Sequence, residues 1–144
     1  LDVTIQAQIL DLMKKLNKEK GTAIMLITHD LGVVANMCDR VVVMYAGKVV
    51  EEGDVRTILK SPKHPYTKGL IRSLPKLSKR EERLYSIPGN VPKPGSIRAG
   101  CRFAPRCEEA FEMCFKEEPE LLQMKEGHHC RCFLYEKEGS VTHG

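Results

Sequence analysis

Apolar residues near the start of the chain recur every three or four positions: Ile5, Ile9, Leu12, Met13 and Leu16. This spacing predicts an amphipathic helix, and Gly21 follows it as a typical helix end. The next apolar run, AIMLIT over 23–28, is short and continuous. Such a run is typical of a strand buried on both faces of a parallel sheet.

The following residues repeat the alternation of helix and strand. Asp30 can cap a short helix that runs through Cys38, and residues 40–45 read as a second buried strand. A tight turn at 46–48 then leads into a third strand over 49–52. Residues 1–53 therefore predict an α/β fold with a partial parallel sheet. They form the edge of a larger domain, because two or three strands and two helices bury too little to stand alone.

Residues 54–100 are expected to form a connector. Asp54 can cap a helix over 55–60, and Pro65 can open another over 66–74. Beyond Pro75 the chain is basic and rich in proline, which prevents regular structure. Residues 71–106 contain nine basic and only two acidic residues, although the net charge of the whole chain is only +4. A solvated surface segment explains this excess, so nucleic acid is not predicted as a partner.

Residues 101–144 are predicted to form a small cysteine-rich module. Five of the six cysteines lie between Cys101 and Cys132, and all four phenylalanines lie between Phe103 and Phe133. No apolar run approaches the roughly 18 residues that span a membrane, and no secretory signal is visible. Clustered cysteines without secretion favour metal ligation over a disulfide framework. A segment this short is also expected to need a metal or crosslinks to hold its fold.

The cysteine spacing limits the kind of ligation. A structural zinc site usually opens with two cysteines two to four residues apart, and no such pair opens this segment. Thiolates bind iron–sulfur clusters as well as zinc, and disulfides or free thiols also remain open. Three arginines flank the cysteines and can offset thiolate charge: Arg102, Arg106 and Arg131. A thioredoxin-like redox enzyme is disfavoured because the chain has no C-x-x-C motif.

Several motifs stand in one order along the first part of the chain. LDVT opens it at Leu1, ITHDLGVVA contains His29 directly after the apolar run, and DRVVVMYAGKVVEEG begins at Asp39. These segments closely resemble the D-loop, the switch-histidine loop and the strand pair that follows it in ABC-transporter ATPases. By that resemblance, His29 contacts the terminal phosphate of ATP, and Asp2 lies between two nucleotide-binding domains. The phosphate loop, the signature motif and the catalytic Glu of that family are expected upstream of Leu1.

The rest of the chain resembles one particular branch of that family. SPKHPYTKGL at Ser61 is similar to the HPYT segment of the peptide and nickel branch, where His64 and Tyr66 are expected to be structural. The cysteine pattern resembles the C-terminal extension of oligopeptide and dipeptide transporter ATPases. Some members of that family hold a [4Fe–4S] cluster there. The matching positions are Cys101, Cys107, Cys114 and Cys132, whereas Cys130 stands where the pattern has no cysteine.

The resemblance implies a C-terminal fragment of the ATP-hydrolysing subunit of a peptide importer. The complete subunit would use ATP and Mg²⁺, and this fragment alone is expected to be inactive as an ATPase. Implied partners are a second ATP-binding subunit, the membrane permease and, indirectly, a peptide-binding protein, with the subunit cytoplasmic and peripheral on the inner face of the cell membrane. The alternative is a free-standing zinc or iron–sulfur module that binds nucleic acid or protein.

Overall fold

The computed structural model of the chain describes residues 3–74 and 86–136. The chain divides into two compact units, Leu1–Asp39 and Arg40–Gly144. The first unit contains two helices, and the second contains the sheet, the remaining helices and five of the six cysteines. Among the described residues, no helix is both long enough and apolar enough to cross a membrane.

Both helices of the first unit are those that the sequence predicts. Helix α1 spans Val3–Lys20, and Gly21 follows it with a φ of 66°, a left-handed conformation that glycine adopts without strain. Helix α2 spans Leu31–Met37. The Asp30 side chain caps it by accepting the backbone N–H groups of Gly32 and Val33 at 2.9 and 3.3 Å.

The prediction of a strand over 23–28 is wrong. These residues have no strand assignment, and Met25 and Ile27 are 89% and 91% exposed. A strand exists only where a neighbouring strand completes its backbone hydrogen bonds. No described strand pairs with residues 23–28. The prediction of a parallel sheet is also wrong, because every strand pairing in the observed sheet is antiparallel.

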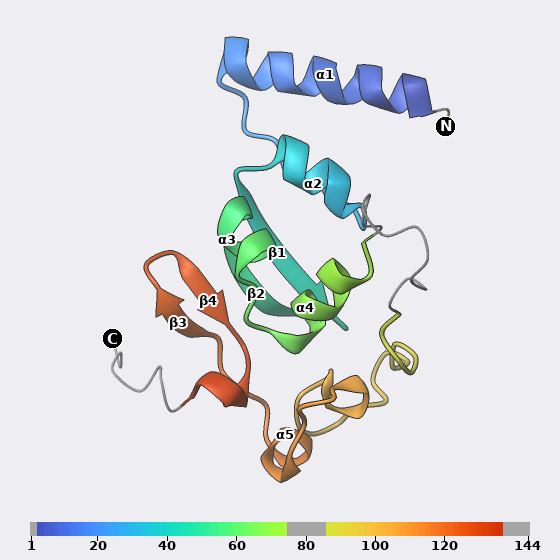
Figure 1. The fold of residues 1–144 in the computed structure, drawn as a ribbon, viewed down its shortest axis with the longest axis vertical. Coiled ribbons are helices and arrows are strands. Elements are labelled where there is room, and N and C mark those ends of the chain that lie inside the picture. Colours follow the sequence, from blue (N-terminus) through green and yellow to red (C-terminus); the bar gives the residue numbers. More distant parts are fainter. Residues whose placement is uncertain (1–2, 75–85, 137–144) are drawn as a thin grey trace. The chain divides into compact units, whose positions relative to one another are not determined.

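The sheet of the second unit joins two distant segments of the chain (Figure 1). Strands β1 (Arg40–Tyr45) and β2 (Lys48–Asp54) form the expected hairpin. Ala46 and Gly47 turn it with φ values of 47° and 83°, the geometry of a tight hairpin turn. Strands β3 (Leu122–Lys125) and β4 (His128–Cys130) complete the order β1-β2-β4-β3. The cysteine-rich segment therefore extends the same sheet.

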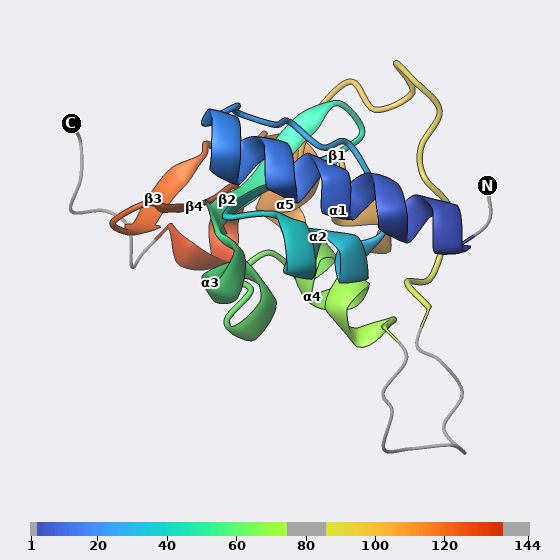
Figure 2. The ribbon, with the colours of Figure 1, turned by 90° about the horizontal axis from the view of Figure 1, so that it is seen from above.

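Two short helices follow the hairpin and pack on one face of it. Helix α3 spans Val55–Lys60 and helix α4 spans Pro65–Arg72, and both lie on the same side of β1 and β2 (Figure 2). Asp54 and His64 are their N-caps. The buried core beneath them comprises Val43, Tyr45, Val50, Ile58 and Phe103. Because Phe103 comes from the cysteine-rich segment, that segment shares the core of the hairpin.

The cysteine-rich segment is built from short elements. It contains the 3-10 helix η1 (Ala104–Arg106), helix α5 (Glu112–Lys116) and a second 3-10 helix, η2 (Phe133–Tyr135). All six cysteines of the chain are free thiols. The segment has packing partners on β2 and in the shared core, so its fold does not depend on cysteine ligation alone.

Candidate functional site

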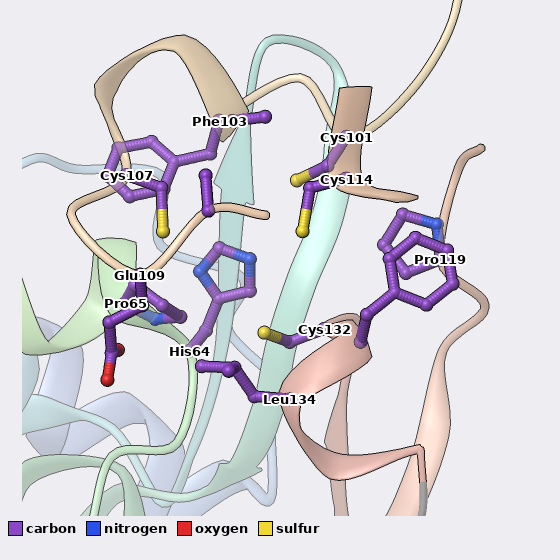
Figure 3. Close-up of a pocket in the computed structure, with 13 residues that line it drawn as sticks. His64, Pro65, Cys101, Phe103, Cys107, Glu109, Cys114, Pro119, Cys132 and Leu134 are labelled. Atoms are coloured by element: carbon purple, nitrogen blue, oxygen red, sulfur yellow. The ribbon is translucent and has the colours of Figure 1, made fainter. Parts of the chain in front are cut away.

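Four cysteines surround one small cavity in the second unit. Cys101, Cys107, Cys114 and Cys132 all line it, and their sulfur atoms point into the space between the chain segments (Figure 3). The cavity has a volume of about 20 Å³, and most of its other lining residues are apolar. These are the four cysteines that the family resemblance predicts as ligands. They come from a segment of 32 residues.

Backbone hydrogen bonds fix the first three of these cysteines. The N–H of Cys101 donates to the carbonyl oxygen of Cys114 at 2.7 Å, which brings the two residues side by side. Turns from Cys101 through η1 lead to Cys107, whose N–H donates to the Ala104 carbonyl at 3.2 Å. Gly100 makes the close approach possible. Its φ is +83°, and a side chain there would lie 2.6 Å from the Cys114 carbonyl oxygen.

The fourth cysteine of the cavity is Cys132. It precedes η2, and its carbonyl accepts the N–H of Tyr135 at 3.3 Å. Cys130 is fully buried at 0% exposure but does not line the cavity. It lies on β4, opposite Glu51 of β2 and Leu122 of β3. Cys132 lies beyond the end of β4, where the chain turns into η2, so the two cysteines have different surroundings.

The cavity disfavours isolated thiolates. Burial raises the pKa of Cys101 and of Cys107, and it raises the pKa of Cys132 to about 12. Repulsion from the other cysteines of the cavity is a smaller part of this rise in the pKa of Cys132. Backbone hydrogen bonds oppose these effects, from Phe103 and Ala104 to Cys101, from Glu109 to Cys107 and from Leu134 to Cys132. Such bonds are typical of sulfur ligands, and a bound cation would supply the missing charge compensation.

The HPYT segment forms one wall of the cavity. His64 is 1% exposed, and its ring lies 5.8 Å from that of Phe103. Its Nδ1 atom accepts the N–H of Tyr66 at 3.0 Å, so His64 caps α4 through its side chain. Tyr66 packs on Tyr45 and Phe103 with ring centroids 4.7 and 5.4 Å apart. The structural role expected for His64 and Tyr66 is confirmed.

A buried carboxylate behind this wall is absent from the sequence-based list of site residues. Glu51 is 0% exposed, and its oxygens accept the N–H groups of Lys63 and His64 at 2.9 and 2.8 Å. Its Oε2 atom also lies 2.6 Å from Nε2 of His128. Glu51 thereby ties the loop before α4 to β4. The signal in the sequence is a glutamate inside the expected strand over 49–52, at a position that the sheet buries.

The three arginines expected to offset thiolate charge do not line the cavity. Their guanidinium groups instead donate to backbone carbonyl oxygens: Arg102 to Ala46, Arg106 to Pro88 and Ile87, and Arg131 to Val49 and Pro119. They therefore brace the loops around the cysteines. Among the described residues, no group of three or more His, Cys, Asp or Glu side chains is placed to hold a metal ion.

The predicted nucleotide-contacting residues belong to the first unit. His29 is exposed and immediately precedes Asp30, the cap of α2. The Asp30 N–H donates to the Thr28 hydroxyl oxygen at 3.0 Å, which orders the turn around His29. Asp2 lies outside the described residues. The structure therefore gives the local setting of His29 but no further geometry of a nucleotide site.

Comparison with known protein families finds a match in the middle of the chain. Residues 50–114 match the model of the family described as "Oligopeptide/dipeptide transporter, C-terminal region". This range contains the HPYT segment and three of the cavity cysteines, Cys101, Cys107 and Cys114. The match covers residues 50–114 alone, which is somewhat less than half of the chain.

Its relatives are similar over almost the whole chain. The oligopeptide transport ATP-binding protein AppD of Bacillus subtilis is 52% identical over 97% of this chain and 43% of its own length. The dipeptide transport ATP-binding protein DppD of Escherichia coli is 46% identical over 92% of this chain and 40% of its own length. The oligopeptide transport ATP-binding protein OppD of Haemophilus influenzae is 48% identical over 93% of this chain and 41% of its own length. The chain thus spans about two fifths of these curated relatives.

Proposed function

We propose that this chain is the C-terminal part of an ATP-binding subunit that hydrolyses ATP to drive import of oligopeptides or dipeptides. The observation that carries this proposal is a sequence identity of 46% to 52%, over more than nine tenths of the chain, with proteins named for peptide transport and ATP binding. The order of the D-loop-like, switch-histidine-like and HPYT segments supports it. No described feature favours the alternative of a free-standing metal-binding module.

His29 is the residue of this chain that we assign to the chemistry of ATP. Catalysis of phosphoryl transfer depends on donors placed around the phosphate that carries the developing charge. An exposed imidazole at the start of α2 is available for such a contact. ATP and Mg²⁺ would be bound mainly by the upstream part of the complete subunit, and Asp2 would lie between this subunit and a second one. The permease partner would place the subunit at the inner face of the membrane.

The test of this assignment is His29→Ala in the complete subunit, assembled with its partners. Loss of one transition-state contact predicts a fall in ATP turnover of roughly 10²-fold or more, with ATP binding retained. Peptide uptake should fall in parallel. Asn36→Ala is the matched control, because Asn36 is exposed on α2, the helix that follows His29, and it should leave turnover unchanged. Wild-type turnover in the His29 variant would contradict the assignment.

For the cysteine cavity, we infer a [4Fe–4S] cluster held by Cys101, Cys107, Cys114 and Cys132. Tetrahedral zinc with bonds of about 2.3 Å needs sulfur ligands within about 4 Å of one another. A cubane cluster spreads its four cysteine ligands over four irons, so its ligands stand farther apart. Four thiols that line one cavity support a shared cofactor, and the resemblance of the cysteine pattern favours the cluster. The cluster would crosslink α5, η1 and the chain after β4.

Metal analysis of protein purified without oxygen tests this inference. A [4Fe–4S] cluster predicts about four irons and four acid-labile sulfides per chain and a brown colour. One zinc per chain with no iron would contradict the inference. Iron content should rise with pH during reconstitution, because ligand thiols with raised pKa values must lose protons to bind metal.

A further inference from the structure

The cysteine cavity is too small to admit a reagent or a cofactor while its walls stay in place. Its volume of about 20 Å³ gives room for about one water molecule. Two of its walls are firmly held. The N–H of Cys101 donates to the Cys114 carbonyl oxygen at 2.7 Å, and the N–H of His64 donates to the buried carboxylate of Glu51 at 2.8 Å. Any larger group must therefore enter where another wall opens.

The third wall is the short segment that begins at Cys132. Cys132, Phe133 and Leu134 line the cavity together (Figure 3). The two backbone hydrogen bonds that close η2, from the N–H groups of Tyr135 and Glu136, are both long at 3.3 Å. A three-residue 3-10 helix with such bonds has little stability of its own. The position of η2 therefore depends on its contacts with other segments.

The side chain of Tyr135 makes these contacts. Its hydroxyl donates to the backbone carbonyl oxygen of Lys63 at 2.6 Å and accepts a hydrogen bond from the Lys68 ammonium group at 3.3 Å. The Lys63 ammonium group also lies over the Tyr135 ring, 5.5 Å from its centroid. Lys63 is itself fixed, because its N–H donates to the buried Glu51 carboxylate at 2.9 Å. Tyr135 thus ties the wall that contains Cys132 to the loop before α4, 72 positions away in the sequence.

We propose that Tyr135 is the positioning residue for Cys132 and the latch of the cysteine cavity: its hydroxyl holds η2 against Lys63, which keeps the Cys132 thiol in the cavity and closes the entrance to it. The consequence for cofactor retention rests on the proposed function of the cavity. The effect on Cys132 does not, and it can be measured in metal-free protein. The competing role for Tyr135 is general support of the fold, which would expose Cys130 on β4 as readily as Cys132.

Three substitutions in the complete subunit separate these roles. Tyr135→Phe keeps the ring beside the Lys63 side chain but removes the hydrogen bond to the Lys63 carbonyl. Tyr135→Ala removes the ring as well. Tyr66→Phe is the matched control, because it removes a phenol hydroxyl from the same unit and leaves the hydrogen bond between Tyr135 and Lys63 in place.

The first measurement is the alkylation rate of each cysteine in metal-free protein, resolved by mass spectrometry. A thiol in so small a cavity reacts only when the segment that covers it opens, so its rate reports that opening. Loss of one hydrogen bond of ordinary strength predicts about a fivefold faster reaction of Cys132 in Tyr135→Phe, and a larger increase in Tyr135→Ala. Cys130 is fully buried between two strands and should react at the wild-type rate in Tyr135→Phe. Both cysteines should react at wild-type rates in Tyr66→Phe.

The second measurement is the rate of iron loss to a chelator from protein purified without oxygen. It should rise about fivefold in Tyr135→Phe and stay unchanged in Tyr66→Phe. A wild-type alkylation rate for Cys132 in Tyr135→Phe would overturn the assignment even if Tyr135→Ala reacts faster, because the ring and not the hydroxyl would then hold η2. Equal acceleration of Cys130 and Cys132 would also overturn it, because Tyr135 would then support the fold as a whole.

The two readouts also separate this inference from the cluster itself. If the wild-type protein binds no iron, the cofactor proposal fails, and the alkylation rates of Cys132 and Cys130 still decide the role of Tyr135. If iron is bound and is lost equally fast from Tyr135→Phe and from the wild type, the cluster stands and the latch is excluded.

Discussion

The carboxylate of Glu51 on β2 lies 2.6 Å from Nε2 of His128 on β4, although 77 positions separate the two residues in the sequence. Both side chains are buried, at 0% and 3% exposure. A buried carboxylate is tolerated only where hydrogen bonds replace its hydration, and Glu51 has three donors within 2.9 Å. The pair therefore joins the hairpin to the cysteine-rich segment at a point where water is excluded.

Substitution of Glu51 should be among the most damaging single changes in this unit. Glu51→Ala leaves the N–H groups of Lys63 and His64 buried without an acceptor, so we expect a loss of about 3–5 kcal/mol in unfolding free energy. Urea denaturation of the complete subunit measures it. The control is Glu52→Gln on the same strand, where the partly exposed side chain lies 2.9 Å from His129 and the loss should stay below about 1 kcal/mol. Similar losses in both variants would contradict a special role for Glu51.

Gly100 is a second position with a sharp expected outcome. In Gly100→Ala the added carbon would lie 2.6 Å from the Cys114 carbonyl oxygen and from the Phe115 carbonyl carbon, both backbone atoms. The chain must shift, which should separate Cys101 from Cys114 and destabilise the unit by more than about 2 kcal/mol.

Gly95→Ala provides the matched control for this change. Gly95 has a similar φ of +77°, but nothing lies within 4 Å of the position of an added carbon. Only backbone strain should appear there, about 1 kcal/mol. Thermal unfolding and iron content together measure both variants. Retention of wild-type iron content by Gly100→Ala would show that the Cys101–Cys114 contact is not required.

Local sequence signals predicted helices α1 to α4 and the first hairpin well, but not α5, η1 or η2 in the cysteine-rich segment. The caps Asp30 and Asp54 and the turn at Ala46-Gly47 act within a few residues, and the structure places each where the pattern indicated. The segment 23–28 shows the limit of this approach. An apolar run indicates that a strand would be buried, but hydrogen bonds to another segment decide whether it forms.

The pairing of β4 with β2 could not be read from the pattern. Strand β4 has only three residues, two of them histidines, and its partner lies far away in the sequence. The convergence of four cysteines was predicted only through the family resemblance, because spacing alone left zinc and disulfides open. Glu51 was missed since a charged residue in a short strand usually faces solvent.

Stability of the metal-free protein should depend on pH through His64. Burial, together with the nearby Lys68 charge, lowers the pKa of His64 from 6.5 to about 4, against an opposing hydrogen bond with the Arg131 backbone. The unfolded chain binds the proton more tightly, so this contribution is complete above pH 6.5 and is lost as the pH falls towards 4. It amounts to about 3 kcal/mol. As the pH falls from 6.5 to 4, the denaturation midpoint should fall less steeply in His64→Asn than in the wild type. Equal slopes in the two proteins would show that His64 is not the group responsible.

The alkaline side should show the opposite dependence through Cys132. Burial first, and then the neighbouring thiols, raises the pKa of Cys132 from 9.0 to about 12. A group with a raised folded pKa stabilises the fold below its unfolded pKa. Stability of the metal-free protein should therefore be complete below pH 9 and decline as the pH rises towards 12. Cys132→Ala should reduce this decline, as measured by denaturation midpoints between pH 8 and pH 11 set against the wild type.

The cysteines themselves allow the cavity assignment to be tested one residue at a time. Serine in place of Cys101, Cys107, Cys114 or Cys132 removes one thiolate from the cavity, and each variant should lose most of its iron during anaerobic purification. Cys38 belongs to the other unit, so the Cys38→Ser variant should keep the wild-type iron content. Cys130→Ala changes a fully buried residue that does not line the cavity, so we expect lower stability but unchanged iron stoichiometry. Iron retained in Cys132→Ser but lost in Cys130→Ala would instead assign Cys130 as the fourth ligand, against the geometry of β4 and the loop that follows it.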